Sequence, residues 1–175
     1  MITDPRTDQQ LIAALNAGEL DAFDALYFRY RDFVLRLARR WTGNDADALD
    51  VAQETFLYLA GKFPGFRLTS AMTSLLYPVV RNLSIAARKR SQRFAGDESL
   101  DRVPVESTDA TDDLGDALRH LSDAHREVIL MRFVDDLSLQ EIADALQIPL
   151  GTVKSRLHQA IEKLRDDDRT REYFS

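Results

Sequence analysis

Side chains able to bind nucleic acid recur along one stretch of the chain, SLQEIADALQIPLGTVKSRLHQAIEKL, residues 138–164. Lysine and arginine can hold phosphate oxygens, while hydroxyl, imidazole and amide groups can hydrogen-bond to base edges in a major groove. The side chains that we assign to base edges are Lys154, Ser155, His158 and Gln159, and those that we assign to phosphates are Thr152 and Arg156. The chemistry that this set offers is recognition of duplex DNA.

Two short helices around a turn would place these groups on one face. Ser138 and Glu141 have the S-x-x-E spacing of a capping box, and Pro149 lies at or beside the start of the second helix. Inward-facing residues at helical spacing are Ile142, Ala143 and Leu146 in the first helix, and Val153, Leu157, Ile161 and Leu164 in the second. An ordinary solvated helix face is the alternative. The coincidence of capping box, turn and apolar stripe favours a DNA-binding helix-turn-helix.

The charge of the chain is segregated. A net charge of −6 argues against indiscriminate binding to nucleic acid. However, residues 81–93 contain five basic residues and no acidic ones, whereas residues 97–116 contain eight acidic residues and one arginine. Two basic segments, the second within residues 150–165, therefore flank an acidic one.

Helical periodicity through most of the 175 residues predicts an all-α protein. Thr7 and Gln10 resemble a capping box for a first helix, and Asp21 can cap a second. The apolar stripe expected in the second helix is Phe23, Leu26, Tyr27, Tyr30, Val34, Leu37, Ala38 and Trp41. A third helix opens at Asn44 or Asp45, and its expected apolar side is Leu49, Ala52, Phe56 and Leu59. A fourth covers about 74–92, where Pro78 predicts a kink or a start near Tyr77.

Two small helical domains joined by a flexible acidic linker are therefore expected. Residues 95–113 hold too few large apolar side chains to offset the entropy of ordering them. Further helices over 114–121 and 122–134 lead into the helix-turn-helix. The expected boundaries are 7–94 for the first domain, 95–113 for the linker and 114–168 for the second domain.

Composition excludes several other classes of protein. The chain has no cysteine, so disulfides and thiolate metal sites are impossible. Its N-terminus lacks the features of a secretory signal, and no apolar run approaches the roughly 20 residues that span a bilayer, so we expect a cytoplasmic protein. A carboxylate metal site at Asp45, Asp47, Asp50 and Glu54 is not expected, because no second helix with carboxylates is predicted to face them. No cofactor or metal is predicted.

The stretch LSLQEIADALQIPLGTVKSRLHQAIEKLRD, residues 137–166, resembles region four of the sigma-70 family, in particular the extracytoplasmic-function (ECF) sigma factors, and it also resembles LuxR-type regulators. AFDALYFRYRDFVLRLARRWTGNDADALDVAQETFLYL, residues 22–59, resembles sigma region two, and LLYPVVRNLSIAARKR, residues 75–90, resembles the promoter-melting helix. The order of these segments favours a sigma factor over a LuxR-like regulator.

The resemblance implies a protein that catalyses nothing but binds RNA polymerase core, places it on promoter DNA and assists strand opening. It implies that the polymerase-binding face is Asp50, Gln53, Glu54 and Leu57, with a solvated acidic face and a buried Leu57 as the alternative. It implies that the groups contacting the downstream element are Tyr77, Arg81, Asn82, Arg88, Lys89 and Arg90, with packing inside the helical bundle as the alternative for Tyr77. Residues 66–72 resemble a segment that holds a flipped base. The residues assigned above to DNA recognition would read the upstream element. An anti-sigma factor is a further possible partner.

Three residues depart from the family pattern. Leu75 stands where tryptophan is usual and Pro78 where a basic residue is usual, which keeps open an inactive sigma-like interaction module. Gln147 replaces the usual turn glycine and would cost about 1 kcal/mol if its backbone is left-handed.

Overall fold

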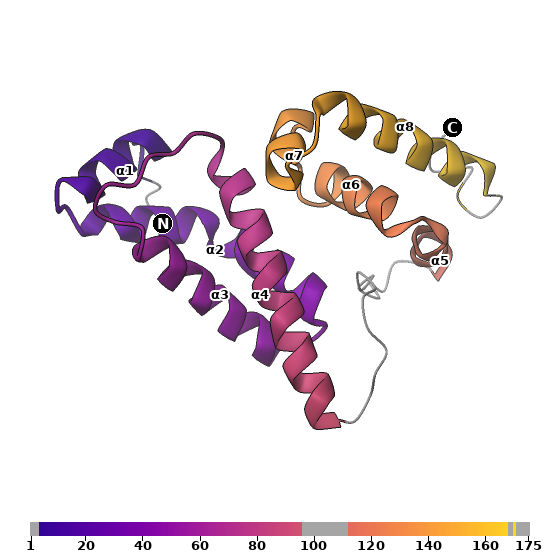
Figure 1. Ribbon diagram of the computed structural model, residues 1–175, viewed down its shortest axis with the longest axis horizontal. Helices are drawn as coiled ribbons and strands as arrows, with labels where there is room; N and C mark the ends of the chain where they lie inside the picture. The colour runs from indigo at the N-terminus through magenta and orange to yellow at the C-terminus, as the bar shows by residue number, and fades with distance from the viewer. Residues whose placement is uncertain (1–3, 96–111, 168–169, 171–175) are drawn as a thin grey trace. The chain divides into compact units, whose positions relative to one another are not determined.

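The computed structural model describes residues 4–95, 112–167 and 170, and the chain divides into two compact units, Met1–Glu98 and Ser99–Ser175 (Figure 1). All regular structure within these described ranges is helical, as the sequence predicted. Most of the expected linker, residues 96–111, lies outside the described residues. Within the described part of the chain, no helix combines the length and apolar character needed to cross a membrane.

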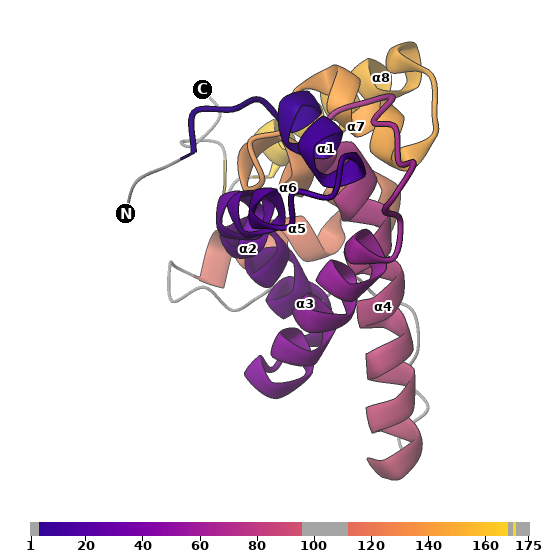
Figure 2. The same cartoon turned by 90° about the vertical axis from the view of Figure 1, so that its left-hand side faces the viewer.

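The first unit is a bundle of four helices. They are α1 (Asp8–Asn16), α2 (Asp21–Thr42), α3 (Asp45–Ala60) and α4 (Met72–Ala95). The long helix α2 packs against α1, α3 and α4, and α3 also packs against α4 (Figure 2). The core between them contains Leu11, Leu26, Leu37, Leu59 and Leu76, all fully buried.

Local capping sets where these helices begin and end. The Thr7 hydroxyl accepts a hydrogen bond from the Gln10 N–H, and the Gln10 side chain accepts one from the Thr7 N–H, so the predicted capping box is confirmed. The Asn44 side chain caps α3 by accepting from the Asp47 N–H at 2.8 Å, which is also as predicted. Asp21 is not a cap, because Leu20 occupies that position and Asp21 is the first residue inside α2.

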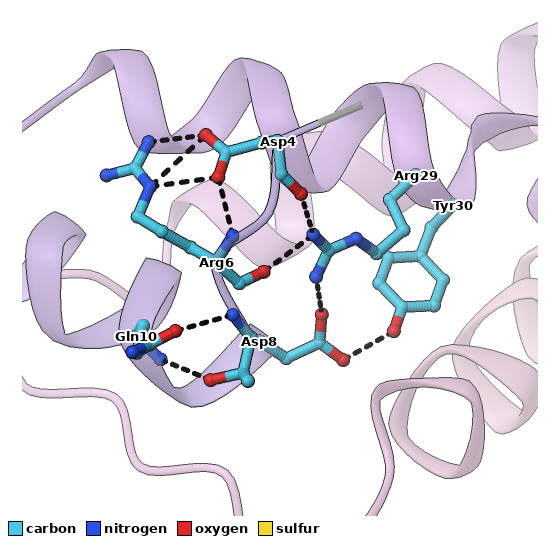
Figure 3. A network of polar contacts seen from close by, with 7 residues as sticks. Asp4, Arg6, Asp8, Gln10, Arg29 and Tyr30 are labelled. Carbon is cyan, nitrogen blue, oxygen red and sulfur yellow. Dashed lines mark hydrogen bonds and ion pairs between the residues drawn. The ribbon is translucent and has the colours of Figure 1, made fainter. Parts of the chain in front are cut away.

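The segment before α1 is tied to α2 by a polar network (Figure 3). The Arg29 guanidinium donates hydrogen bonds to the carbonyl oxygens of Asp4 (3.0 Å) and Arg6 (2.7 Å) and to the carboxylate of Asp8 (2.6 Å). The other oxygen of Asp8 accepts from the Tyr30 hydroxyl. Hydrogen bonds from the Arg6 side chain, and then from its backbone N–H, hold the pKa of Asp4 at about 2, below its usual 3.8.

The buried side of α3 differs in part from the predicted stripe. Leu49 was expected in the core but is 57% exposed, whereas Ala48 and Val51 are buried. Tyr27 of α2 was likewise expected inside and is 39% exposed. The reason is that α3 is covered by both α2 and α4, so the small residues Ala48 and Thr55 face the crowded side. Helical periodicity alone does not choose between two adjacent stripes of one helix.

Helix α4 runs through Pro78 rather than starting after it. It begins at Met72, so the predicted alternative of a start near Tyr77 is wrong. Met72, Leu76 and Val80 are all buried on either side of the proline. Their packing against α2 and α3 offsets the missing backbone hydrogen bond, which costs about 3 kcal/mol in an isolated helix.

The second unit also contains four helices within the described residues: α5 (Asp112–His120), α6 (Asp123–Phe133), α7 (Leu139–Leu146) and α8 (Leu150–Asp166). Helix α8 packs against α6 and α7 (Figure 1). The Arg126 side chain, 4% exposed, donates to the carbonyl oxygens of Leu118, Arg119 and Leu121 at the end of α5. The buried guanidinium thus provides hydrogen-bond donors for backbone carbonyl oxygens at the C-terminal end of α5.

Candidate nucleic-acid interface

Helices α7 and α8 form the predicted helix-turn-helix. The Glu141 N–H donates to the Ser138 hydroxyl oxygen at 3.2 Å and the Ser138 N–H donates to the Glu141 carboxylate at 2.9 Å, which confirms the capping box. Gln147 ends α7 with φ 54° and ψ 43°, the left-handed conformation in which a non-glycine residue is strained. Pro149 is the residue directly before α8, as predicted.

The buried side of the helix-turn-helix includes alanines that were not part of the predicted apolar stripe. Val153 and Leu164 are buried as predicted, but Leu157 and Ile161 are only half-buried and Ala160 is fully buried. In α7, Ala145 is buried whereas Leu146 is half-buried. These small side chains let the helices approach closely, so the larger residues at the edge keep part of their surface in solvent.

The outer side of α8 presents the groups assigned to DNA. Lys154, Ser155, His158 and Gln159 are exposed, while Thr152 and Arg156 are half-buried at the edge of the helix. Glu162 is exposed on the same helix, and its carboxylate pairs with the Arg165 guanidinium at 3.3 Å. The other basic residues of α8 are Lys154 and Arg156 in its first half and the exposed Lys163 in its last turn.

A contact between α6 and α8 was not foreseen from the sequence. The Nε2 of His125 in α6 lies 3.1 Å from the Gln159 side-chain oxygen in α8. Its Nδ1 lies 3.0 Å from the Ser122 hydroxyl. The two partners are 34 residues apart in the chain, so the contact depends on the packing of α6 against α8 and leaves no local signal.

The basic side of α4 is only partly available to a ligand. Asn82, Lys89 and Arg90 are exposed, while Arg81 and Arg88 are half-buried. The Arg81 guanidinium lies over the Trp41 ring, 5.1 Å from its centroid. The Arg90 guanidinium lies 3.8 Å from the Glu54 carboxylate, so the basic side of α4 borders the acidic side of α3.

Tyr77 requires a correction. It was predicted to contact or stack on bases, but it is 1% exposed and packs in the core of the first unit. A buried ring cannot stack on a nucleotide without opening the bundle. Helical spacing alone did not show whether Tyr77 lies on the buried side or on the basic side of α4. A tyrosine, which has both an aromatic ring and a hydroxyl group, is compatible with either side.

The face of α3 that was assigned to the polymerase is open to solvent. Asp50, Gln53, Glu54 and Leu57 are all exposed, and Leu57 is 63% exposed, so the alternative with a buried Leu57 is wrong. Gln53 and Leu57 also line an apolar hollow of about 460 Å³ whose other wall is formed by α2. The α2 side of this hollow, with Phe23, Tyr27 and Leu35, was missed because those residues were counted as core or not considered.

Metal ligands are not gathered anywhere in the described residues. Within the ranges 4–95 and 112–167, no three histidine, cysteine, aspartate or glutamate side chains lie close enough together to hold a metal ion.

Comparison with known protein families divides the chain in the same way. Residues 26–94 match the family described as Sigma-70 region 2, and residues 117–166 match the family described as Sigma-70, region 4. Two solved structures share the fold: the sigma factor RpoE in complex with the anti-sigma factor NepR from Bartonella quintana (TM-score 0.60, 22% identity, 84% of this chain and 96% of that one) and CnrH in complex with the cytosolic domain of CnrY (TM-score 0.67, 23% identity, 92% and 98%).

Relatives of similar length are also found by sequence. The chain is 32% identical over 173 residues to the ECF RNA polymerase sigma factor SigW of Bacillus subtilis, covering 88% of this chain and 92% of the relative. It is 38% identical over 166 residues to the ECF RNA polymerase sigma factor SigL of Mycobacterium tuberculosis, covering 88% and 93%. The match to region 2 decides against the LuxR-like alternative, and the chain belongs to the ECF sigma factors of the sigma-70 family.

Proposed function

We propose that this chain binds the core of bacterial RNA polymerase, directs it to specific promoters and assists strand opening. The observation that carries the proposal is the presence, in one chain, of a helix-turn-helix with an exposed basic face and an α3 face with exposed carboxylates around Leu57. Sigma factors are transcription initiation factors, so the chemical step belongs to the polymerase. Such a protein works in the cytoplasm.

The α3 face suits a basic protein partner. Asp50 and Glu54 supply negative charge that complements a cationic surface. Leu57 lies at the edge of the apolar hollow beside α2 and supplies an apolar contact. An exposed leucine at the edge of an apolar hollow loses little by being covered and gains from burial. We therefore assign Asp50, Gln53, Glu54 and Leu57 to polymerase binding.

Helix α4 is assigned to the downstream promoter element. Lys89 and Arg90 are exposed and can hold phosphates, Arg81 and Arg88 can do so from the edge, and Asn82 can contact a base. Tyr77 is not part of this assignment because it is buried. Leu75 is half-buried and Pro78 lies within the helix, so strand opening here depends on the basic and amide groups.

Helix α8 is assigned to the upstream element. Lys154, Ser155, His158 and Gln159 contact base edges, and Thr152 and Arg156 contact phosphates. Two structural neighbours were solved with an anti-sigma factor or with the cytosolic domain of CnrY, which supports an anti-sigma partner for this chain as well.

Transcription with purified core polymerase on a library of promoter fragments tests the proposal. The chain should make initiation selective for a subset of fragments. Leu57→Asp should weaken core binding at least about tenfold, because it places a charge in an apolar contact. Leu20→Asp is the matched control, since Leu20 is 77% exposed at the start of α2 and should leave core binding unchanged.

Two results would count against the proposal. Initiation that is indifferent to the added chain would reject promoter direction altogether. Core binding without initiation would favour the alternative of an inactive sigma-like interaction module.

A further inference from the structure

A short chain of side-chain hydrogen bonds links the start of α6 to the outer side of α8. The Ser122 hydroxyl lies 3.0 Å from Nδ1 of His125, and Nε2 of His125 lies 3.1 Å from Oε1 of Gln159. Gln159 is exposed and is one of the residues assigned to base edges, whereas His125 lies in α6 and Ser122 directly precedes that helix. The imidazole of His125 in α6 thus holds the side chain of Gln159, one of the α8 residues assigned to base edges.

The hydrogen bond to Oε1 of Gln159 determines which nitrogen of the His125 imidazole carries the proton. A side-chain amide oxygen only accepts, so Nε2 of His125 must carry hydrogen and donate to Gln159. In the neutral ring Nδ1 is then an acceptor, and the Ser122 hydroxyl donates to it. Each group in the chain therefore has a complementary partner.

Ser122 has a position that would normally give its hydroxyl another role. It is the residue preceding α6, where a serine oxygen usually accepts from a backbone N–H in the first turn. No such side-chain bond is formed here, and the backbone N–H groups of His125 and Arg126 instead reach the Ser122 carbonyl oxygen. The hydroxyl is thereby left to orient the imidazole.

The contact also orients the amide of Gln159. Its oxygen and nitrogen lie on opposite sides of the same carbon, so an oxygen held toward α6 turns the NH₂ group away from α6. A free glutamine pairs with adenine by using both its oxygen and its nitrogen. Here the contact with His125 holds the oxygen toward α6, so the group directed away from α6 is the NH₂ with its two N–H donors.

We propose that His125 is a specificity-determining positioning residue, which holds Gln159 so that α8 selects guanine at one base pair of the upstream element. Guanine presents two adjacent acceptors, N7 and O6, in the major groove, whereas adenine presents one acceptor beside a donor and cytosine presents a donor. Two amide hydrogens match the guanine pattern. The inference rests on the proposed binding of α8 to the upstream element.

Selection by the complete holoenzyme tests the inference. Core polymerase with the full-length chain transcribes a promoter library randomised across the upstream element, and the transcribed sequences are counted. Gln159→Ala identifies the base pair that this residue reads, and the wild type should prefer guanine there. His125→Ala should reduce the preference for guanine over adenine about three- to tenfold, the effect of one lost orienting hydrogen bond, while preferences at other positions remain.

Three further variants sharpen the test. His125→Gln keeps an N–H donor near the position of Nε2 and should restore the guanine preference. Gln159→Glu replaces the NH₂ group by an acceptor and should move the preference from guanine to cytosine. His120→Ala removes an exposed histidine of α5 and should leave every preference unchanged.

The outcomes separate the inference from the proposed function. If the wild type directs initiation with an upstream preference and His125→Ala leaves the guanine preference intact, the inference is wrong and the proposed function stands. A wild-type preference for adenine at the Gln159 position would also overturn it. If the wild type shows no upstream preference at all, the proposed function fails and the inference with it. If His125→Ala does not fold, the wild-type preference at the Gln159 position decides, because guanine supports the inference and adenine overturns it.

Discussion

The side-chain oxygen of Asn16 accepts a hydrogen bond of 2.6 Å from the backbone N–H of Gly65, and so joins the last residue of α1 to the loop between α3 and α4. The same oxygen accepts from the Phe66 N–H at 3.1 Å, and the Asn16 NH₂ group donates to the Phe66 carbonyl oxygen at 2.8 Å. One amide thus satisfies three backbone groups of a loop that has no regular structure of its own. Phe66 is also the first residue of the segment 66–72 that was singled out in the sequence.

Asn16→Ala should therefore increase the mobility of the loop between α3 and α4 more than that of the helical bundle. Losing these bonds should cost about 1–3 kcal/mol and should speed hydrogen exchange at Gly65 and Phe66 by about tenfold or more. Gln9→Ala, an exposed change on the same helix, is the control and should shift stability by less than about 0.5 kcal/mol. Unchanged exchange at Gly65 would show that other contacts hold the loop.

Arg126 is predicted to be the most sensitive arginine of the second unit. Arg126→Met keeps much of the buried stem but removes the guanidinium that donates to the carbonyl oxygens of Leu118, Arg119 and Leu121. We expect a loss of about 2–4 kcal/mol, measured by denaturant unfolding together with hydrogen exchange in α6 and α8. Arg165→Met removes an exposed pair with Glu162 and should cost less than about 0.5 kcal/mol. Equal losses in both variants would contradict this role for Arg126.

The lowered pKa of Asp4 predicts a pH dependence on the acid side. Because the folded-state pKa is about 2 and the usual value is 3.8, the carboxylate contributes stability that is fully present above pH 4 and is lost as the pH falls toward 2. The stability difference between wild type and Asp4→Asn should therefore shrink over that window. Thermal unfolding at pH 5, 3.5 and 2.5 measures it, and a constant difference would exclude the link.

Gln147 predicts a stabilising substitution. Its φ of 54° is strained for a residue with a side chain, so Gln147→Gly should raise the free energy of unfolding by about 0.5–1 kcal/mol. Gln140→Gly, in the first turn of α7, should lower it by about 1 kcal/mol, because glycine is a poor helix former and the hydrogen bond from Gln140 to Asp144 is lost. Denaturant unfolding of both variants gives opposite signs if the left-handed turn is the cause.

Arg156 is predicted to act on phosphate rather than on sequence. Arg156→Ala should weaken holoenzyme binding to all promoters and should reduce the slope of log affinity against log salt concentration by about one. Arg165→Ala is the control, because Arg165 lies near the end of α8 and pairs with Glu162. A change of base preference in Arg156→Ala would mean that this residue reads bases.

Local features of the fold were predictable from the sequence, and features that depend on packing were not. The capping boxes at Thr7 and Ser138 involve residues three apart, so the sequence contains the whole interaction. The burial of Tyr77 and the exposure of Leu49 depend on which side of a helix meets its neighbours. Periodicity gives the width of an apolar stripe but not its exact orientation in a bundle.

The same distinction applies to the candidate site. Lys154, Ser155, His158 and Gln159 share one face of α8, so their joint exposure follows from their spacing. The contacts of Gln159 with His125 and of Asn16 with Gly65 join residues 34 and 49 positions apart. Only the packed structure brings these side chains together, and for that reason the orientation of the Gln159 amide could not be read from its position in the sequence.

The attachment of residues 4–8 to Arg29 has a practical consequence for fragment design. A shortened protein starting at residue 26, where the match to region 2 begins, would lose the buried Leu11, Ile12 and Leu15. It would also deprive the Arg29 guanidinium of its acceptors at Asp4, Arg6 and Asp8. A fragment intended for crystallisation or binding assays should therefore retain Asp4, with any purification tag separated from it by a spacer.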